Sequence, residues 1–420
     1  MSVTSENTSS YNEFAERLVQ GGVLLDPWYE GEPRFQGEPV YLEQGTAREL
    51  CTAAEEVAGV YNELCEICAG QPELIDEFFG LTPFQKLMWA SSTPAWHGIA
   101  RADFFETPEG LRVCELNCDT PTGEAEAVLT NALVAGSAEG VEDPNATLEQ
   151  RFCEMVDMLA GATLEPGFER TVGLVYPTEL TEDLPLIRLY QQWLSARGWR
   201  VVLGSPYNLK LAKDGRAMLF DEPCSAIVRH YKTDWWGERE SPWLDEAPYA
   251  DQQPLDRQLA VLIEATIENR TVVINPLGSV LPQNKKAMAF MWENKHLFSE
   301  ASQRIIEQRV PVTARLEAVH KEQLSAQRED WVLKSDYGAE GNEVIVGRLE
   351  SQELWDESLA QAAPGRWIVQ KYFHAIPNDK GETTNLGVYV VGGQASGLYA
   401  RVSRGPTNEY ARSAPTLVLR

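Results

Sequence analysis

The sequence predicts an α/β lobe followed by an α+β lobe, and two patterns lead to this fold class. Between residues 172 and 203, the apolar segment VGLVY, an amphipathic segment that ends at Gly198 and the segment WRVVLG follow one another. Such a strand–helix–strand unit builds parallel sheets. Between residues 330 and 402, short alternating segments separated by Gly-rich turns are typical of antiparallel strands.

The composition fits a globular chain of two or three lobes. The chain has 420 residues, of which 43% are hydrophobic and 24% are charged, and a domain holds about 150 residues. No run of about 18 apolar residues is present, so we expect no membrane span. The amino terminus lacks a basic segment followed by an apolar block, so we expect no secretory signal and a cytoplasmic location.

The net charge excludes one class of partner. With 36 Lys and Arg against 63 Asp and Glu, the formal charge is −27. Proteins bind phosphate backbones through basic patches, so nucleic acid is not an expected partner. The acidity also agrees with a cationic partner, although acidic enzymes are common enough that it does not require one.

The first half of the chain reads as a series of helices interrupted by one strand pair. Residues 1–20 are predicted to be a polar arm without regular structure, and apolar residues over 46–80 recur at the helical period. LTPFQKLMWASS suggests another helix, a strand–turn–strand unit follows at 100–117, and further helices are expected at 124–136 and 147–160.

The second half supplies most of the strands. SAIVRHY and TVVINP, with the helix DRQLAVLIEATIEN between them, extend the parallel lobe. After a helix around 284–300, the antiparallel strands are expected at WVLKSDYG, EVIVGR, RWIVQKYF, LGVYVV and ASGLYARVS.

The seven cysteines predict reduced thiols in a cytoplasm. An odd number of cysteines in a long chain without a secretory signal is typical of a reducing compartment. Cys65 and Cys68 form a CxxC pair inside a predicted helix, but neither a second pair nor a nearby histidine completes a zinc site. We therefore expect ordinary core cysteines.

The most informative segment is ARADFFETPEGLRVCELNCDTPTGE, which reads as a hairpin. If residues 108–110 form a three-residue loop, residue 107 lies opposite 111. This register places Asp103 opposite Glu115 and Arg101 opposite Asn117 on one face. Ala102, Phe104, Cys114 and Leu116 then occupy the other face, as a core-facing surface requires.

Paired carboxylates on a strand face have two interpretations. Carboxylates directly opposite each other repel, but a divalent cation between them removes the repulsion, and oxygen donors from Asp, Glu and Asn suit Mg²⁺. The alternative is a solvated outer face of the hairpin, where charged residues are common. The spacing of Asp103, Glu115 and Asn117 leaves both interpretations open.

Two lysines and a glycine turn add a phosphate-binding pattern. Lys285 begins a helix directly after a strand, and Lys334 ends a strand that leads into a turn with Gly338 and Gly341. A strand–Gly-turn–strand element offers backbone N–H groups to phosphates while lysines supply positive charge. Gly turns and surface lysines are also ordinary structural features. No Walker A, HExxH or GxSxG pattern occurs, so hydrolysis by a protein nucleophile is not predicted.

Assembled in this order, the motifs resemble the synthetase portion of the glutathionylspermidine synthase family, a circularly permuted ATP-grasp fold. The resemblance runs from about residue 20 to the carboxyl terminus. It rests on R-x-D-F followed by E-x-N-x-D, on N-K before an apolar helix with Trp, on K-x(3)-G-x-x-G, and on the V-Q-K and G-x-Y-x-R strands. The residues that carry it are Arg101, Asp103, Phe104, Glu115, Asn117, Asp119, Asn284, Lys285, Trp292, Lys334, Gly338, Gly341, Gln370 and Arg401.

The resemblance implies a role for each matched residue. Asp103, Glu115 and Asn117 would coordinate two Mg²⁺ ions that bridge the phosphates of ATP. Lys285 and Lys334 would hold the phosphates under a lid formed by the Gly338–Gly341 turn. The remaining implied contacts are Gln370 near the adenine with Lys371 beside it, Arg101 and Arg401 at the transferred phosphoryl group, and Thr120 at the acceptor carboxylate.

The resemblance also implies an activity, which is ATP-dependent ligation of a carboxylate to an amine through an acyl phosphate. The partners would be a small-molecule or peptide carboxylate and an amine, with glutathione and a polyamine as the family pair. The amidase domain of the best-known members is not expected. Asp234, Glu238 and Glu240 are candidates for amine binding, although acidic residues are expected in any acidic chain.

Two other functions stay open at this stage. A degenerate ATP-grasp homologue would bind nucleotide without turnover, as a binding or scaffold protein. A phosphotransferase would use the same ATP site on a hydroxyl acceptor. The resemblance divides the chain into the hairpin-bearing part of the core (1–165), a substrate-side α/β lobe (166–283), a nucleotide-binding lid (284–365) and closing core strands (366–420).

Overall fold

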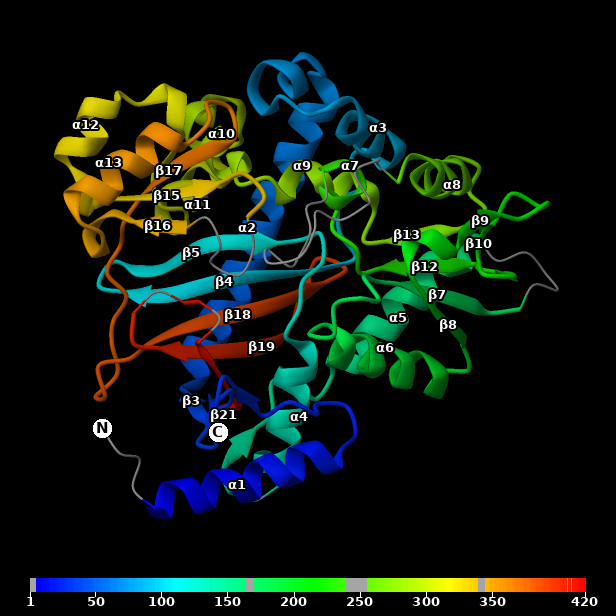
Figure 1. Cartoon of the computed structure of the whole chain (residues 1–420), viewed down its shortest axis with the longest axis horizontal. Helices are drawn as coiled ribbons and strands as arrows, with labels where there is room; N and C mark the ends of the chain where they lie inside the picture. Colours follow the sequence, from blue (N-terminus) through cyan, green and yellow to red (C-terminus); the bar gives the residue numbers. More distant parts are fainter. Residues whose placement is uncertain are drawn as a thin grey trace.

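The structure, a computed structural model, describes residues 5–136, 138–163, 169–238, 255–338, 344–405, 407–408 and 410–420. A five-stranded antiparallel sheet lies at the centre, with one lobe on either side (Figure 1). Its strand order is β20-β19-β18-β4-β5. The strands are β4 (Ile99–Thr107), β5 (Gly110–Asn117), β18 (Thr383–Val391), β19 (Gln394–Ser403) and β20 (Arg412–Ala414).

The predicted hairpin is present. The expected residue pairs are confirmed, although the turn is shorter than predicted and one strand carries a β-bulge. Thr107 pairs with Gly110 across a two-residue turn, so the expected pairing of residue 107 with 111 is wrong. The register then shifts between Asp103 and Phe104, because a β-bulge adds Cys114 to β5. Beyond the bulge, Asp103 pairs with Glu115 and Arg101 with Asn117, as predicted.

The predicted parallel lobe is confirmed as a four-stranded sheet of order β13-β12-β7-β8. Gly198, at a φ of +80°, follows the end of α6, as the sequence suggested. The elements of this lobe are β7 (Thr171–Val175), α6 (Leu184–Ala196), β8 (Arg200–Gly204), β12 (Ala226–Arg229), α8 (Asp256–Ile267) and β13 (Val272–Ile274), and a small sheet of β9 (Leu209–Leu211), β10 (Ala217–Leu219) and β11 (Glu222–Pro223) accompanies it.

The other lobe holds a second antiparallel sheet of order β14-β17-β15-β16 with its own small core around Trp355. β17 begins just beyond the predicted domain limit at residue 365 and pairs with β14 and β15. The predicted domain limits themselves stay predictions. The elements are α10 (Lys286–Glu293), α11 (Glu300–Arg309), β14 (Thr313–Arg315), α12 (Lys321–Ala326), β15 (Trp331–Ser335), β16 (Val344–Val346), α13 (Gln352–Gln361) and β17 (Trp367–Lys371).

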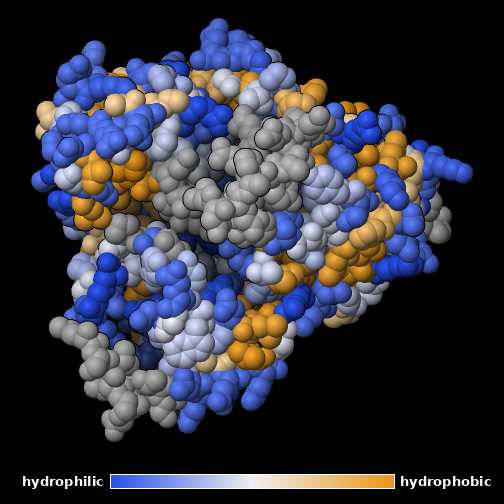
Figure 2. All heavy atoms as spheres, in the orientation of Figure 1, coloured by the Kyte–Doolittle hydropathy of each residue, from blue (hydrophilic) through white to orange (hydrophobic). Residues whose placement is uncertain are grey.

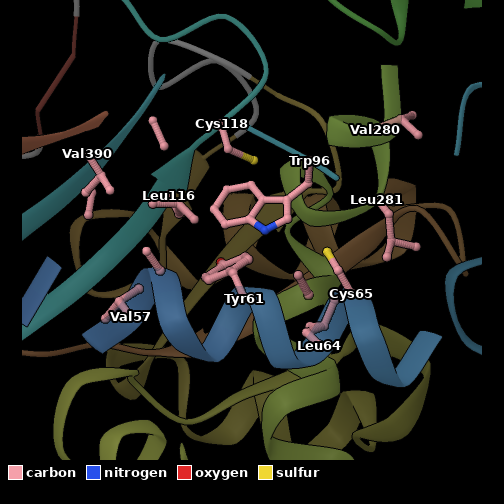
Figure 3. Close-up of a cluster of buried hydrophobic side chains, with 14 of the residues drawn as sticks. Val57, Tyr61, Leu64, Cys65, Trp96, Leu116, Cys118, Val280, Leu281 and Val390 are labelled. Atoms are coloured by element: carbon pink, nitrogen blue, oxygen red, sulfur yellow. The ribbon is translucent and has the colours of Figure 1, made fainter. Parts of the chain in front are cut away.

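The long helix α2 (Gln44–Gly70) crosses behind the central sheet and supplies much of the core (Figure 1). In Figure 3, Tyr61 and Cys65 of α2 lie around Trp96 together with Leu116 and Cys118 of the hairpin strand and its exit. All seven cysteines are free, and Cys65 and Cys68 are fully buried, so the prediction of core cysteines is confirmed. Burial raises the pKa of Cys68 to about 12.

The prediction of an unstructured arm over residues 1–20 is wrong, because Ser5–Gln20 forms the helix α1. Phe14 and Leu18, one helical turn apart, are buried against the rest of the chain, and Arg17 donates a hydrogen bond of 2.7 Å to the carbonyl of Leu133. The remaining helices are α3 (Pro83–Ser92), α4 (Glu124–Ala135), α5 (Leu148–Gly161), α7 (Trp235–Glu238) and α9 (Val280–Gln283).

Short strands tie the two ends of the chain together. β21 (Thr416–Leu419) pairs in parallel with β3 (Val40–Leu42) and antiparallel with β6 (Val141–Glu142), and β1 (Trp28–Tyr29) pairs with β2 (Glu32–Pro33).

None of the described helices has the length and apolar character needed to cross a bilayer. The face drawn in Figure 2 is mostly hydrophilic, with hydrophobic residues in separate patches rather than in one large surface. The circular permutation stays a prediction.

Candidate nucleotide and metal site between the sheets

Asp103 is the most enclosed polar residue of the hairpin. Its carboxylate is fully buried and accepts hydrogen bonds from Arg101, at 2.6 Å from Nε to Oδ1 and 2.9 Å from Nη2 to Oδ2. Arg401, from β19, donates to Oδ2 over 3.3 Å. Gly387 lies opposite Asp103 on β18, and a Cβ at that position would be 2.8 Å from Cδ of Arg101. A glycine therefore makes room for the Arg101 side chain.

Asn117 joins the two hairpin carboxylates. Its Nδ2 lies 3.4 Å from Oδ2 of Asp103 and 3.3 Å from Oε1 of Glu115. The three side chains predicted to form a metal site therefore do share one face, as the register requires.

Glu115 lies in a strongly positive environment. Burial raises the pKa of its carboxyl, but the charges of Lys285, Lys334, Arg401 and Arg101 outweigh burial and lower it to about 2. Burial also lowers the pKa of Lys285, an effect that the nearby Glu115 opposes. Two buried lysines next to one half-buried carboxylate leave excess positive charge, which suits an anionic ligand such as a phosphate chain.

The two lysines reach this point from different elements. Nζ of Lys334, on β15, donates to Oε1 of Gln370 on β17 at 2.8 Å and to the carbonyl of Cys114 at 3.2 Å. Nζ of Lys285, next to α10, donates to the carbonyl of Gly338, in the turn that follows β15. The site is therefore formed where the sheet of β14–β17 meets the central sheet.

The donor set fits a magnesium–nucleotide complex. Two carboxylates and an amide converge, and a small cavity beside them is lined by Tyr61, Glu115, Leu116, Pro282, Gln283, Lys285 and Met288. Asn117 presents its amide nitrogen to the carboxylates, and a half-turn about its Cβ–Cγ bond would present the oxygen that a cation needs. Within the described ranges, no group of three or more His, Cys, Asp and Glu side chains forms a metal cluster.

The structure brings most, though not all, of the predicted site residues together. Lys371 lies apart, since neighbouring residues on a strand face opposite sides: its Nζ is 3.4 Å from Asp330 and 4.2 Å from the ring of Trp331. Gly341 and Glu240 lie outside the described residues, as does the side chain of Glu238. The residues that do meet are Arg101, Asp103, Glu115, Asn117, Lys285, Lys334, Gly338, Gln370 and Arg401.

Thr120 lies on a different cavity, at the carboxyl ends of β12 and β13. This cavity is lined by Ile99, Asp119, Thr120, Pro121, Tyr190, Val228, Arg229, His230, Ile274 and Asn275. Asp119 fixes the loop beside it, because the fully enclosed guanidinium of Arg229 donates to Oδ1 at 2.5 Å and the Thr233 N–H donates to Oδ2 at 2.7 Å.

Sequence reasoning missed this second cavity. The signal was available in SAIVRHY, because Arg229 ends a buried strand of a parallel sheet and His230 follows it, at the edge where ligands bind in open α/β folds. Glu124 carried no such signal. It is fully buried, and its link to Tyr190 joins residues far apart in the sequence.

Comparison with known proteins identifies the family. The family model described as "Glutathionylspermidine synthase preATP-grasp" matches residues 28–419. A glutathione synthetase-like effector (GSS30) from Globodera pallida, solved in its apo form, aligns with a TM-score of 0.61 and 10% identity over 99% of this chain and 98% of its own. At that identity the likeness shows the fold alone.

A second solved structure and the curated proteins add no further argument. A putative gamma-glutamylcysteine synthetase from Methylobacillus flagellatus KT aligns with a TM-score of 0.46 and 14% identity over 86% of this chain and 85% of its own. No curated protein matches the chain. Since the family match spans nearly the whole chain, the protein belongs to the glutathionylspermidine synthase preATP-grasp family.

Proposed function

We propose that this protein is an ATP- and Mg²⁺-dependent ligase that joins a carboxylate to an amine through an acyl phosphate. One observation carries the proposal: the paired carboxylates Asp103 and Glu115 and the buried lysines Lys285 and Lys334 meet at the junction of two sheets. Family membership agrees with this reaction class.

Each group of side chains has a distinct task in the proposal. Asp103, Glu115 and Asn117 would hold magnesium, which would neutralise charge on the phosphates of ATP when bound. Lys285 and Lys334 would hold the phosphates, and Gln370, held by Lys334, would lie towards the nucleotide base. Arg101 and Arg401 would steady the transferred phosphoryl group.

The reaction itself needs positioning rather than a protein nucleophile. An oxygen of the substrate carboxylate attacks the γ-phosphorus of ATP, and ADP leaves. The amine nitrogen then attacks the acyl carbon, an amide forms, and inorganic phosphate leaves. The family name makes glutathione and spermidine the first acid and amine to test. The cytoplasmic location of the protein stays a prediction.

The test is a panel of acids and amines with Mg·ATP, including glutathione with spermidine, scored by phosphate release and product mass. We expect ADP and phosphate in equal amounts with an amide product, only when an acid and an amine are both present. A protein that fails to bind Mg·ATP would overturn the proposal. Binding without turnover would instead identify a nucleotide-binding scaffold, and a phosphorylated product would identify a phosphotransferase.

A further inference from the structure

One carboxylate oxygen of Asp103 is shared by three side chains. Its Oδ2 lies 2.9 Å from Nη2 of Arg101, 3.3 Å from Nη2 of Arg401 and 3.4 Å from Nδ2 of Asn117. Oδ1 accepts instead from Nε of Arg101 at 2.6 Å. Because Nδ2 of Asn117 also contacts Oε1 of Glu115, Oδ2 is the oxygen of Asp103 on the side of the second carboxylate. A cation held by both carboxylates would therefore bind Oδ2.

The two arginines and a metal ion compete for this oxygen. A carboxylate oxygen binds Mg²⁺ at about 2.0–2.1 Å, which is closer than the N–H donors around Oδ2. The side chain of Asp103 has an exposed fraction of 0%, so little water is available to screen a dication from the two guanidinium charges. Magnesium at Oδ2 therefore displaces the two Nη2 groups.

The charge balance of the site decides when this displacement is favourable. Among the described side chains, four cations act on Glu115, and the two carboxylates Asp103 and Glu115 leave two of these positive charges uncompensated. A bare Mg²⁺ ion would double that excess. A complex of ATP with one magnesium ion carries about two negative charges and cancels the excess. The four cations are Lys285, Lys334, Arg401 and Arg101.

We propose that the arginines and magnesium bind Oδ2 of Asp103 in turn, the arginines in the free chain and magnesium once ATP is bound. This inference rests on the proposed ATP-dependent function. When the metal takes Oδ2, Nη2 of Arg101 and Nη2 of Arg401 are released towards the transferred phosphoryl group. Arg101 stays anchored meanwhile, because its Nε holds Oδ1 and its Nη1 donates to the carbonyl of Thr122 at 2.6 Å. Both arginines thus reach the phosphoryl group only when metal and nucleotide are in place.

The two arginines differ in how firmly the fold holds them. The side chain of Arg101 is 7% exposed, and its guanidinium carbon lies 5.6 Å from the centre of the Tyr399 ring. The side chain of Arg401 is 20% exposed and reaches Asp103 from β19. Replacing Arg401 therefore removes a competitor for Oδ2 with less disturbance of the core than replacing Arg101.

The test measures binding of Mn²⁺ to the full chain without nucleotide, by the loss of the electron paramagnetic resonance signal of the free ion. Mn²⁺ accepts the same oxygen ligands as Mg²⁺. We expect weak binding to the wild-type chain and at least about tenfold tighter binding when a non-hydrolysable ATP analogue is present. Without nucleotide, Arg401→Met should bind Mn²⁺ several-fold more tightly than wild type. Arg101→Met should gain more, since it removes the shorter contact to Oδ2. If Arg101→Met does not fold, Arg401→Met decides alone.

Lys334→Met is the matched control, because it removes one positive charge from the same site without freeing Oδ2. Nζ of Lys334 donates to Gln370 and to the carbonyl of Cys114. If charge alone governed metal binding, this variant would gain more than Arg401→Met, because Lys334 acts on Glu115 more strongly than Arg401 does. The exchange predicts the opposite order. Asp103→Asn, added to Arg401→Met, should abolish the gain.

The outcomes separate this inference from the ligase proposal. The exchange is overturned if the folded arginine variants bind Mn²⁺ no more tightly than wild type, if Lys334→Met gains as much as Arg401→Met, or if the gain survives Asp103→Asn. It is also overturned if the wild-type chain binds Mn²⁺ equally with and without nucleotide. Gains in the order predicted, in a chain that forms no amide with any acid and amine, would support the exchange and overturn the ligase proposal alone.

Discussion

Glu115 determines the charge balance of the candidate nucleotide site. Its carboxylate lies against two buried lysines and is one of the proposed Mg²⁺ ligands, so an amide in its place would remove a charged ligand of the metal that accompanies ATP. We predict that Glu115→Gln weakens Mg·ATP binding by at least about tenfold, or roughly 1.4 kcal/mol, as measured by titration calorimetry. Glu106→Gln, an exposed carboxylate on the same hairpin, is the matched control and should bind like the wild-type chain. Equal affinities in all three chains would remove Glu115 from the site.

Glu124 should also leave a signature in stability, independent of any substrate. Because burial raises its pKa to about 7, the folded chain holds this proton more tightly than the unfolded chain. The corresponding stability is present below the pKa of the unfolded carboxyl and is lost as pH rises through about 7. Compared with wild type, Glu124→Gln should gain stability over that range, by about 3 kcal/mol at most. Denaturant unfolding at pH 4.5, 6 and 8 measures the difference, and parallel curves would contradict the assignment.

At the scale of elements, the pairing of β4 with β18 positions Arg101 and Asp103. Gly387 allows this pairing, because a Cβ there would lie 2.8 Å from Cδ of Arg101 and 3.1 Å from Oδ1 of Asp103. We predict that Gly387→Ala displaces this ion pair and lowers Mg·ATP affinity several-fold. Gly397→Ala is the matched control, because a Cβ at residue 397 would contact Asn145 rather than Arg101 and Asp103. The control should lose stability without losing affinity; equal affinity losses would contradict the prediction.

The elements also show how much of the fold could be predicted from the sequence. The hairpin pairs were predictable because alternation and a turn determine a local register. The β-bulge at Cys114 could not be predicted, because a bulged strand has the same amino-acid composition as a regular strand. The helix α1 was missed because few apolar residues, such as Phe14 and Leu18, lie within a polar segment. The neighbours of β4 and the cavity behind Thr120 depend on non-local pairing, which one sequence pattern does not reveal.

At the scale of the whole molecule, Asn275 joins the parallel sheet to the central sheet. Its Oδ1 accepts from the N–H groups of Gly98 and Ile99 at 2.7 and 2.9 Å, and its Nδ2 donates to the carbonyls of Ile99, Cys118 and Asp119 at 2.8 to 3.0 Å. This one buried side chain satisfies backbone groups at both ends of the hairpin.

We therefore predict that Asn275→Ala destabilises the chain by about 2–4 kcal/mol, because several buried backbone groups lose their partners. Asn275→Asp keeps the acceptor but sets a buried carboxyl oxygen against the three carbonyls that Nδ2 contacts, so it should destabilise the chain at least as much as Ala. Chemical denaturation at pH 7 measures the free energy of unfolding. A loss below about 0.5 kcal/mol in Asn275→Ala would show that the two sheets are held together elsewhere.

The order of strands in the central sheet has a consequence for synthesis of the protein. β4 ends at Thr107, but its partner β18 begins only at Thr383, and Arg401 follows on β19. On the ribosome, the hairpin of β4 and β5 therefore emerges long before the strand that completes the sheet. Sheets assembled from such distant segments form slowly and expose strand edges meanwhile. The nascent chain should depend on chaperones until its last strands emerge, and nucleotide binding should begin only then.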